Sequence, residues 1–274
     1  MPELPEVETL RRGIKSFLIN KTIESVNIID RRLRWPIIPE HFFTWVVGKK
    51  VARITRRAKY LLWHLENDAV VVIHLGMSGR LGLFENSAPI EKHTHVIFQL
   101  RERMQVRFRD PRRFGLIEVV PPGQIKSYIR FKNLGVEPLS AAFAVNKVTN
   151  VLKKSKKPIK NWIMDAQNIV GVGNIYANEA LFFAGIHPTR PAHSLKSDEQ
   201  RRLVQSVKSV LTTAIKMGGT TLNDFRNARS EPGFFQLELA VYQRSGQACH
   251  SCGATIERIV MSGRSTFYCP SCQH

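Results

Sequence analysis

The feature that most constrains this fold is a group of four cysteines at the end of the 274-residue chain. They form two CxxC pairs, Cys249 with Cys252 and Cys269 with Cys272, separated by residues 253–268. Two such pairs can present four thiolates to one tetrahedral Zn²⁺, and a closed set of four sulfur ligands leaves no position for a substrate. The spacing therefore predicts one structural Zn²⁺, with redox or disulfide use as the alternative.

The segment between the cysteine pairs has the pattern of a β-hairpin. Residues 254–268 read ATIERIVMSGRSTFY and alternate like two strands around a turn at 261–264. This pattern places Arg264 near the tip of the hairpin. From spacing alone, a solvated turn residue is the simpler interpretation of Arg264.

Length and charge set the broad class of the protein. A chain of 274 residues predicts two domains and a small appendage. Its 41 Lys and Arg against 22 Asp and Glu give a net charge of +19, which predicts a polyanionic partner such as nucleic acid. A generally basic protein is the alternative. The chain has no apolar run of roughly 18 to 20 residues and no signal core, so we expect an intracellular protein without a membrane partner.

The first part of the chain has the pattern of a β-sandwich or barrel. From residue 21 to about 120, short β-branched runs alternate with Gly and Pro. A helix is predicted before them, from residue 5 to about 18, because Pro5 suits a first helical turn and Glu6 and Glu8 lie near its positive end. We place a domain boundary near residue 135.

Helical patterns dominate the second part. The clearest helix is predicted over residues 197–217, with Ser197 and Gln200 spaced as a capping box and Gly218-Gly219 ending it. Its apolar face carries Leu203, Val204, Val207, Val210, Leu211, Ala214 and Ile215. Residues 171–185 (GVGNIYANEALFFAG) predict a Gly-rich turn that leads into a helix, and residues 220–233 predict a mobile loop.

The first residues of the chain suggest a nucleophile. Removal of Met1 exposes Pro2 as a secondary amine, and α-amines titrate near 7.7 to 8.0, so a neutral fraction exists at physiological pH. Such an amine can attack a sugar C1′ and form an iminium, with Glu3 as general acid or base. From local spacing alone, both residues are more simply the lead into a helix.

Seven blocks along the chain change that interpretation. They are PELPEVE at 2–8, RRAKYLL at 56–62, HLGMSGR at 74–80, DPRRFG at 110–115, GVGNIYANE at 171–179, GGTTL at 218–222 and the CxxC tail. In this order they resemble the formamidopyrimidine-DNA glycosylase family of bacteria, whose members remove oxidised purines such as 8-oxoguanine. The resemblance covers nearly the whole chain.

The resemblance implies an α+β multidomain fold in three parts. These are a catalytic N-terminal β-sandwich with flanking helices over 1–135, a helix–two-turn–helix domain with a lesion-recognition loop over 136–240, and a zinc-ribbon β-hairpin over 241–274. It also implies four catalytic residues: Pro2 as nucleophile, Glu3 as its neighbouring acid, Lys59 for proton transfer or phosphate binding, and Arg264 for phosphate binding and δ-elimination.

The resemblance further implies contacts to DNA. Base removal requires the damaged nucleotide to leave the stack. Met77 and Phe114 are expected to fill the gap as apolar wedges and Arg112 to read the orphaned base, although ordinary core residues are the alternative for the wedges. Phosphate contacts are expected from His93, Lys160 and Asn174, the last at the start of a helix.

The implied activity is that of a DNA glycosylase and abasic-site lyase acting on damaged double-stranded DNA through a Schiff base on Pro2, followed by β- and δ-elimination. We expect a monomer in the bacterial cytoplasm, associated with the nucleoid. One alternative is an endonuclease VIII-like paralogue for oxidised pyrimidines, and the PELPEVE and DPRRFG blocks favour the purine enzyme. Another is a non-catalytic zinc-ribbon DNA-binding protein, against which the intact catalytic set argues.

Overall fold

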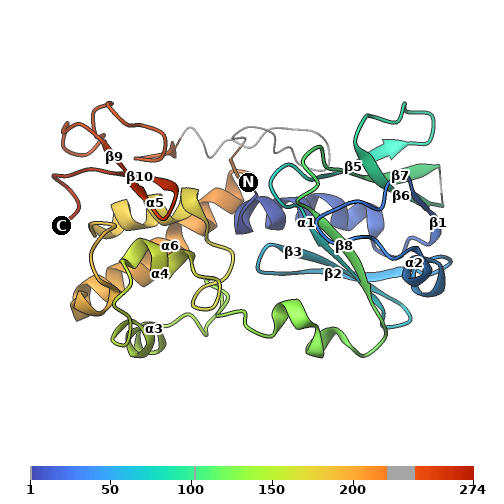
Figure 1. Ribbon diagram of the computed structural model, residues 1–274, viewed down its shortest axis with the longest axis horizontal. Coiled ribbons are helices and arrows are strands. Elements are labelled where there is room, and N and C mark those ends of the chain that lie inside the picture. Colours follow the sequence, from blue (N-terminus) through green and yellow to red (C-terminus); the bar gives the residue numbers. More distant parts are fainter. Residues whose placement is uncertain (1, 102, 221–237) are drawn as a thin grey trace. The chain divides into compact units, whose positions relative to one another are not determined.

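The structure is a computed structural model that describes residues 2–101, 103–220 and 238–274. Contacts divide these residues into two compact units, one with residues up to 132 and 218–220, the other with 133–217 and 238–274. Figure 1 labels their elements. No helix among the described residues is long and apolar enough to cross a membrane. The predicted three-part division stays a prediction.

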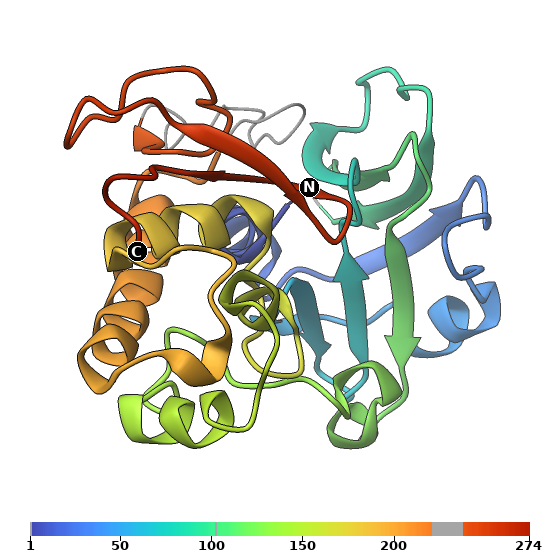
Figure 2. The same cartoon turned by 60° about the vertical axis from the view of Figure 1, so that its left-hand side comes forward.

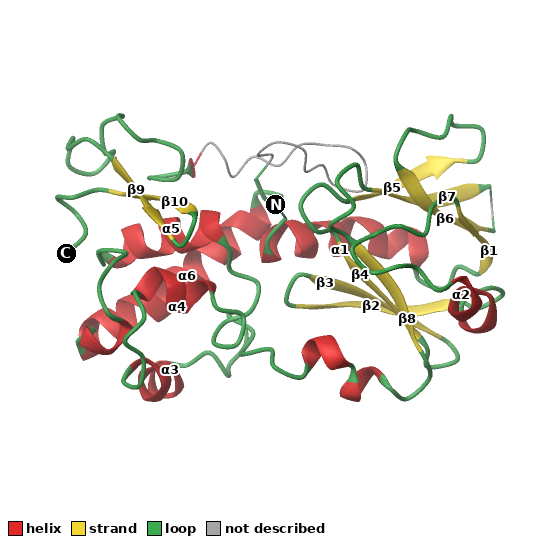
Figure 3. Cartoon of the chain, in the orientation of Figure 1, coloured by secondary structure: helices red, strands yellow, loops and turns green. Residues whose placement is uncertain are grey.

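The first unit is a sandwich of two four-stranded antiparallel sheets, whose strands are yellow in Figure 3. One sheet has the order β1-β6-β7-β5, made of Ile23–Ile28, Thr94–Leu100, Met104–Arg109 and Arg80–Glu85. The other has the order β2-β3-β4-β8, made of Val51–Arg57, Tyr60–Leu65, Val70–His74 and Leu116–Val120. The predicted β-sandwich is confirmed.

Helix α1 (Leu4–Leu18) closes the core of this unit. Leu10, Ile14 and Leu18 are buried in the same apolar cluster as the inward-facing strand residues. Each such side chain stabilises the fold by about 1.5 to 3 kcal/mol through burial. The predicted helix over residues 5–18 is confirmed. The unit also contains α2 (Pro39–Trp45) and the short 3₁₀ turns η1 (Ile125–Ser127) and η2 (Ile129–Phe131).

The second unit is mainly helical. Its helical elements are α3 (Val145–Leu152), α4 (Ile159–Met164), α5 (Asn174–Ala184), η3 (Ala192–Ser194) and α6 (Ser197–Lys216). The predicted apolar face of α6 is buried throughout. Gly218 and Gly219 follow it with φ of 77° and 81°, and α5 ends at Gly185 in the left-handed region. The predicted helix ends are confirmed within one residue.

The predicted capping box of α6 is wrong. The helix is capped by Lys196, whose backbone N–H donates to the carboxylate of Glu199 at 2.7 Å. Ser197 is already the first helical residue. The buried Gln200 instead donates from its side-chain amide to the carbonyl of Leu195 at 2.7 Å. Glu199, at the third helical position, already accepts the backbone N–H of the cap residue. The side chain of Gln200 therefore bonds to the segment just before the helix instead.

A β-hairpin forms between the cysteine pairs, as predicted. Strand β9 (Glu257–Met261) pairs with β10 (Arg264–Tyr268) through a turn at Ser262 and Gly263, both with positive φ. Figure 2 shows this red hairpin lying along α5 within the second unit. The backbone N–H of Phe267 donates to the side-chain oxygen of Asn178 at 2.8 Å, which attaches β10 to that helix.

Candidate functional site

Pro2 and Glu3 lie buried at the start of α1. Glu3 is the N-cap of the helix, and its backbone N–H donates to the carboxylate of Glu6 at 2.8 Å. The positive end of a helix favours negative charge and holds free N–H donors. The buried carboxylate of Glu6, three residues after Glu3, therefore fixes the backbone next to Pro2.

The other carboxylate oxygen of Glu6 binds the chain that follows α6. It accepts the backbone N–H of Thr220 at 2.9 Å and its hydroxyl at 3.1 Å. A Cβ on Gly219, which has φ of 81°, would lie 2.9 Å from the same oxygen, so this position requires glycine. Glu6 thus joins the start of the chain to the first residue of the predicted loop. Apart from Thr220, that loop lies outside the described residues.

Lys59 lies in the tight turn between β2 and β3. The paired residues Arg57 and Tyr60 flank this turn, and Ala58 has a left-handed φ of 54°. The guanidinium of Arg56 donates to the carbonyl of Ala58 at 2.8 Å. This bond compensates for the unfavourable backbone of Ala58 and holds the turn that carries Lys59.

Arg56 also connects this turn to α1. Its Nε lies 3.5 Å from the carboxylate of Glu8. Burial by itself raises the pKa of Glu8, but hydrogen bonds from Arg11 and Arg12 and the nearby charges lower it to about 2. Glu8 is therefore ionised at neutral pH, and the helix that follows Pro2 is linked through charge to the turn of Lys59.

Met77 and Phe114 lie at the tips of two loops, each with 42% of its surface exposed. The alternative of ordinary core residues is therefore wrong. The guanidinium of Arg112 lies over the ring of Phe114 at 5.0 Å. A Cβ on Gly76, beside Met77, would lie 2.4 Å from the carbonyl carbon of Phe114, so the two loops are in direct contact.

Three histidines lie near these loops and differ in environment. His93 is in a turn before β6, with φ of 68°. His95 is buried in β6, where its Nε2 lies 2.9 Å from the carbonyl of Asp110. His74 ends β4, and its Nδ1 accepts the backbone N–H of Gly76 at 3.0 Å. Burial and the charges of nearby cations lower the pKa of His74 to about 4, so it is neutral at pH 7.

Arg264 and two of the predicted phosphate ligands belong to the second unit. Arg264 is exposed and begins β10 at the hairpin tip, as predicted. The buried ammonium of Lys160 donates to the hydroxyl of Thr266 at 2.7 Å and to the carbonyl of Ser265 at 3.2 Å. The side-chain amide of Asn174 donates to the same carbonyl at 2.9 Å. Both residues thus brace the strand that carries Arg264, and their phosphate contacts stay predictions.

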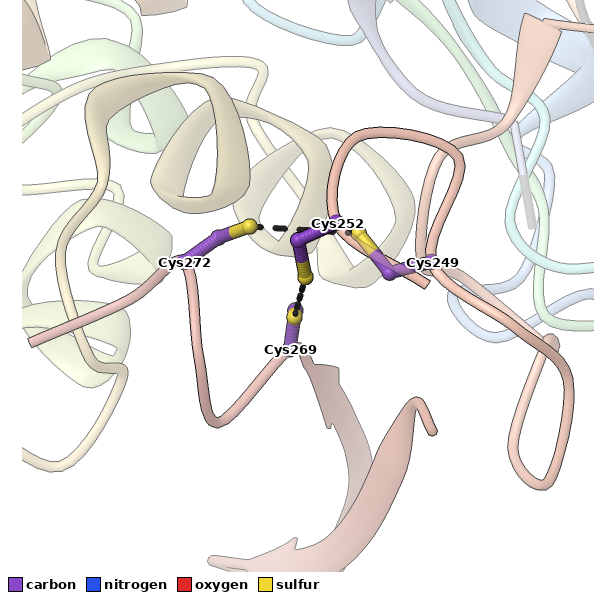
Figure 4. A group of neighbouring side chains, drawn as sticks. All are labelled: Cys249, Cys252, Cys269 and Cys272. Atoms are coloured by element: carbon purple, nitrogen blue, oxygen red, sulfur yellow. Dashed lines mark hydrogen bonds between the residues drawn. The ribbon is translucent and has the colours of Figure 1, made fainter. Parts of the chain in front are cut away.

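The four cysteines come together at the base of the hairpin, as Figure 4 shows. All four sulfur atoms lie within 4.8 Å of one another, with Cys249 and Cys272 at 3.9 Å and Cys252 and Cys269 at 3.5 Å. Ligands at 2.3 Å from a tetrahedral Zn²⁺ lie about 3.8 Å apart, so these residues fit the metal. Four thiolates fill its coordination sphere, which leaves a structural role.

Comparisons with known proteins assign the chain. The family model of the formamidopyrimidine-DNA glycosylase N-terminal domain matches residues 1–117, and that of its H2TH domain matches 134–226. A model described as a zinc finger found in FPG and IleRS matches 246–274. A formamidopyrimidine-DNA glycosylase of Laribacter hongkongensis is 45% identical, and one of Rickettsia africae is 44% identical, each over the full length of both chains. The chain belongs to the formamidopyrimidine-DNA glycosylase family.

Solved structures of this family agree with the fold. A mutant formamidopyrimidine-DNA glycosylase of Lactococcus lactis, in complex with DNA containing Fapy-dG, is 34% identical and superimposes with a TM-score of 0.93 over 100% of both chains. The enzyme from the same organism in complex with DNA containing an abasic site is 33% identical, with a TM-score of 0.92 over 99% of both chains. The predicted family, fold and structural zinc are confirmed.

The sequence patterns missed several residues that organise this glycosylase. Glu6, Asp110 and Glu179 are buried carboxylates whose hydrogen bonds reach distant segments. Glu179 of α5 accepts the backbone N–H groups of residues 240, 241 and 242, at 2.8, 3.1 and 2.8 Å, and burial raises its pKa. The spacing of Glu3 and Glu6 is a capping-box signal, while nothing local marks the other two.

Proposed function

We propose that this glycosylase removes oxidised purines from double-stranded DNA as a monomer and then cleaves the strand at the abasic site, as a base-excision-repair enzyme. The observation that carries the proposal is the buried start of α1, where Pro2 and Glu3 lie at the positive helix end and Glu6 fixes the backbone between them. The relatives in complex with DNA containing Fapy-dG or an abasic site support the same substrates.

The chemistry begins at the nitrogen of Pro2 after removal of Met1. Its lone pair forms a bond to C1′ of the damaged nucleotide, and the electrons of the glycosidic bond leave with the base. The proline nitrogen loses its proton, which balances the proton that the departing base takes up. Opening of the sugar ring then gives an iminium between the proline nitrogen and C1′, with Glu3 supplying the proton to the ring oxygen. Because proline is a secondary amine, this iminium carries a positive charge and withdraws electrons from the sugar.

Strand cleavage follows from that charge. Loss of a C2′ proton expels the 3′ phosphate by β-elimination, and a second elimination expels the 5′ phosphate. Lys59, on its braced turn, and Arg264, at the hairpin tip, would stabilise the departing phosphates. The zinc held by Cys249, Cys252, Cys269 and Cys272 supplies no step of this reaction and maintains the hairpin.

The damaged nucleotide must leave the base stack of the DNA before Pro2 can reach its C1′, at a cost of a few kcal/mol. The exposed side chains of Met77 and Phe114 suit insertion into the vacated space, and Arg112 suits hydrogen bonding to the opposite base. His93, Lys160 and Asn174 are proposed to contact phosphates. The net charge of +19 supports this binding and makes it weaken steeply with salt.

Borohydride trapping tests the nucleophile. Reduction of the iminium during reaction with an 8-oxoguanine duplex should give a covalent protein–DNA adduct in protein that begins at Pro2. The same chain with Met1 retained is the control, since its proline nitrogen is an amide and should neither trap nor excise. Excision by the processed protein without any trapping would overturn the assignment of Pro2.

Side-by-side substrates separate the alternatives. Faster excision of 8-oxoguanine than of thymine glycol is expected, and the reverse would favour an enzyme for oxidised pyrimidines. Strand cleavage at an abasic site should also occur, and its absence would favour a DNA-binding protein without catalysis.

A further inference from the structure

The two loops that carry Met77 and Phe114, called the wedge loops below, each connect one sheet of the sandwich to the other. Residues 75–79 run from β4 in one sheet to β5 in the other, and residues 110–115 run back from β7 to β8. At one end His74 pairs with Leu116, and at the other Arg80 pairs with Arg109. Both loops therefore start and finish on directly paired residues, and they cross between the sheets side by side.

A buried hydrogen-bond network joins the loops midway. The hydroxyl of Ser78 donates to one carboxylate oxygen of Asp110 at 2.6 Å and accepts the backbone N–H of Arg112 at 3.2 Å. The second carboxylate oxygen of Asp110 accepts the backbone N–H of Gly115 at 2.7 Å. Asp110 is fully buried and Ser78 is 9% exposed. Hydrogen bonds to a buried charge are short and strong, and the loss of one leaves an unsatisfied oxygen.

The two loops also approach each other closely at glycines. A Cβ on Gly115 would lie 2.6 Å from the ring of Phe108 and 2.9 Å from the carboxylate of Asp110. On the opposite loop, a Cβ on Gly76 would meet the backbone of Phe114. The loops touch at glycines and are bonded at Ser78, so each exposed apolar tip is one residue away from a fixed point.

We propose that Ser78 and Asp110 are positioning residues that lock Met77 and Phe114 into one rigid wedge. The proposal rests on the wedge role given to these two side chains under the proposed function. An apolar pair held at a fixed separation enters the base stack without losing further conformational freedom, whereas two independent loops would have to be ordered by the DNA. None of the hydrogen bonds of Ser78 and Asp110 given above reaches Pro2, Glu3 or Lys59.

Ser78→Ala tests the lock, because it removes the hydroxyl and adds no bulk. Ser87→Ala, at an exposed turn after β5, is the matched control. Borohydride trapping on a preformed abasic site gives the fraction of active protein in each preparation. Excision of 8-oxoguanine from duplex is then measured in single turnover, together with the fluorescence of 2-aminopurine placed beside the lesion to report insertion.

For Ser78→Ala we expect excision from duplex to fall about tenfold and the 2-aminopurine signal to rise more slowly, with cleavage of an abasic site within about twofold of the parent. Ser87→Ala should match the parent in every measurement. Unchanged excision and insertion by active Ser78→Ala protein would overturn the lock, and so would an equal loss on the abasic site. Parent protein that neither excises nor traps would instead contradict the proposed function.

Discussion

The two units hold their proposed catalytic and wedge residues by different means. In the first, buried carboxylates do so: Glu6 binds the backbone beside Pro2, and Asp110 binds both wedge loops. In the second, Arg264 lies on a two-stranded hairpin attached to its surroundings by Lys160, Asn174 and Asn178 and closed by four cysteines. The apolar cluster beneath this ribbon is much smaller than the core of the sandwich, so we expect its shape to depend on the metal.

This difference teaches that the candidate residues of the first unit are held by a core of their own, while Arg264 of the second unit is held by a ribbon that binds a metal. The sandwich geometry comes from a large core, and buried carboxylates add local order beside Pro2 and in the loops of Met77 and Phe114. The hairpin geometry is expected to depend on the ion that the four cysteines can bind. Experiments that disturb one kind of support and spare the other therefore test the comparison.

Removal of zinc should give the largest effect. Cys269→Ser, or exhaustive chelation, is expected to lower duplex affinity by at least about 100-fold, since structural zinc contributes roughly 10 kcal/mol to the folding of isolated fingers. Hydrogen exchange should show loss of protection in β9 and β10 with protection retained in β1 to β8. Equal loss of protection in the sandwich would break the comparison.

Glu6→Gln should have the next largest effect. A glutamine amide has only one acceptor oxygen, so it cannot accept from both Glu3 and Thr220, and a buried donor left unpaired costs about 1 to 3 kcal/mol. We expect excision of 8-oxoguanine to slow by about 10- to 100-fold in single turnover. Glu24→Gln, an exposed partner of Arg101, is the control. Parent-like excision by Glu6→Gln would show that this carboxylate is not needed for order.

Acid should destabilise the sandwich in two steps. Burial and nearby cations lower the pKa of His64 and His74 to about 4, so below about pH 6.5 the unfolded chain binds protons that the folded chain does not. The free energy of unfolding should therefore fall from pH 6.5 to 4. Protonation of Glu8, with a pKa of about 2, extends the loss from about pH 4.5 downward.

Urea unfolding between pH 7 and 4 measures the first of these steps. His64→Gln should flatten the slope, and His193→Gln, an exposed substitution in the second unit, should leave it unchanged. A slope that persists in His64→Gln and also in His74→Gln would contradict the assignment.

Arg56→Lys should have the smallest effect. Lysine keeps the charge but cannot contact Glu8 and the carbonyl of Ala58 together as arginine does. We expect β-elimination at an abasic site to slow by about threefold to fivefold, with zinc content unchanged. Arg53→Lys, on the same strand, provides the comparison. If Arg56→Lys slowed base excision but not β-elimination, the proposed role of Arg56 in holding the turn of Lys59 would be wrong.

Local patterns predicted much of this molecule because their physical causes are local. The helix start next to Pro5, the glycines that end α5 and α6, and the hairpin between the cysteine pairs all follow from neighbouring residues. The predicted cap of α6 was wrong because two possible capping boxes, Ser197 with Gln200 and Lys196 with Glu199, differ in register by one residue. The prediction of Met77 and Phe114 as exposed wedge residues came from the family resemblance. Local sequence could not give it, because an apolar residue beside glycine is equally typical of a core.

The supporting carboxylates escaped prediction because their partners are distant in the chain. Ser78 and Asp110 are 32 residues apart, and Glu6 and Thr220 are 214 apart. Only the pairing of β4 with β8 and of β5 with β7 brings the first pair together. No periodicity or spacing rule contains that information, because it belongs to the topology of the sandwich.

Strand pairing at both ends of the loops 75–79 and 110–115 limits which insertions and deletions these loops can accept. A residue inserted in or deleted from 75–79 or 110–115 would push a strand one step along its neighbour, and a one-residue slip turns every side chain of that strand to the opposite face. Side chains on the loops can vary, but their lengths are tied to the registers of two sheets. Attempts to redirect this protein to other lesions should therefore exchange residues at the tips and leave the residue count of each loop intact.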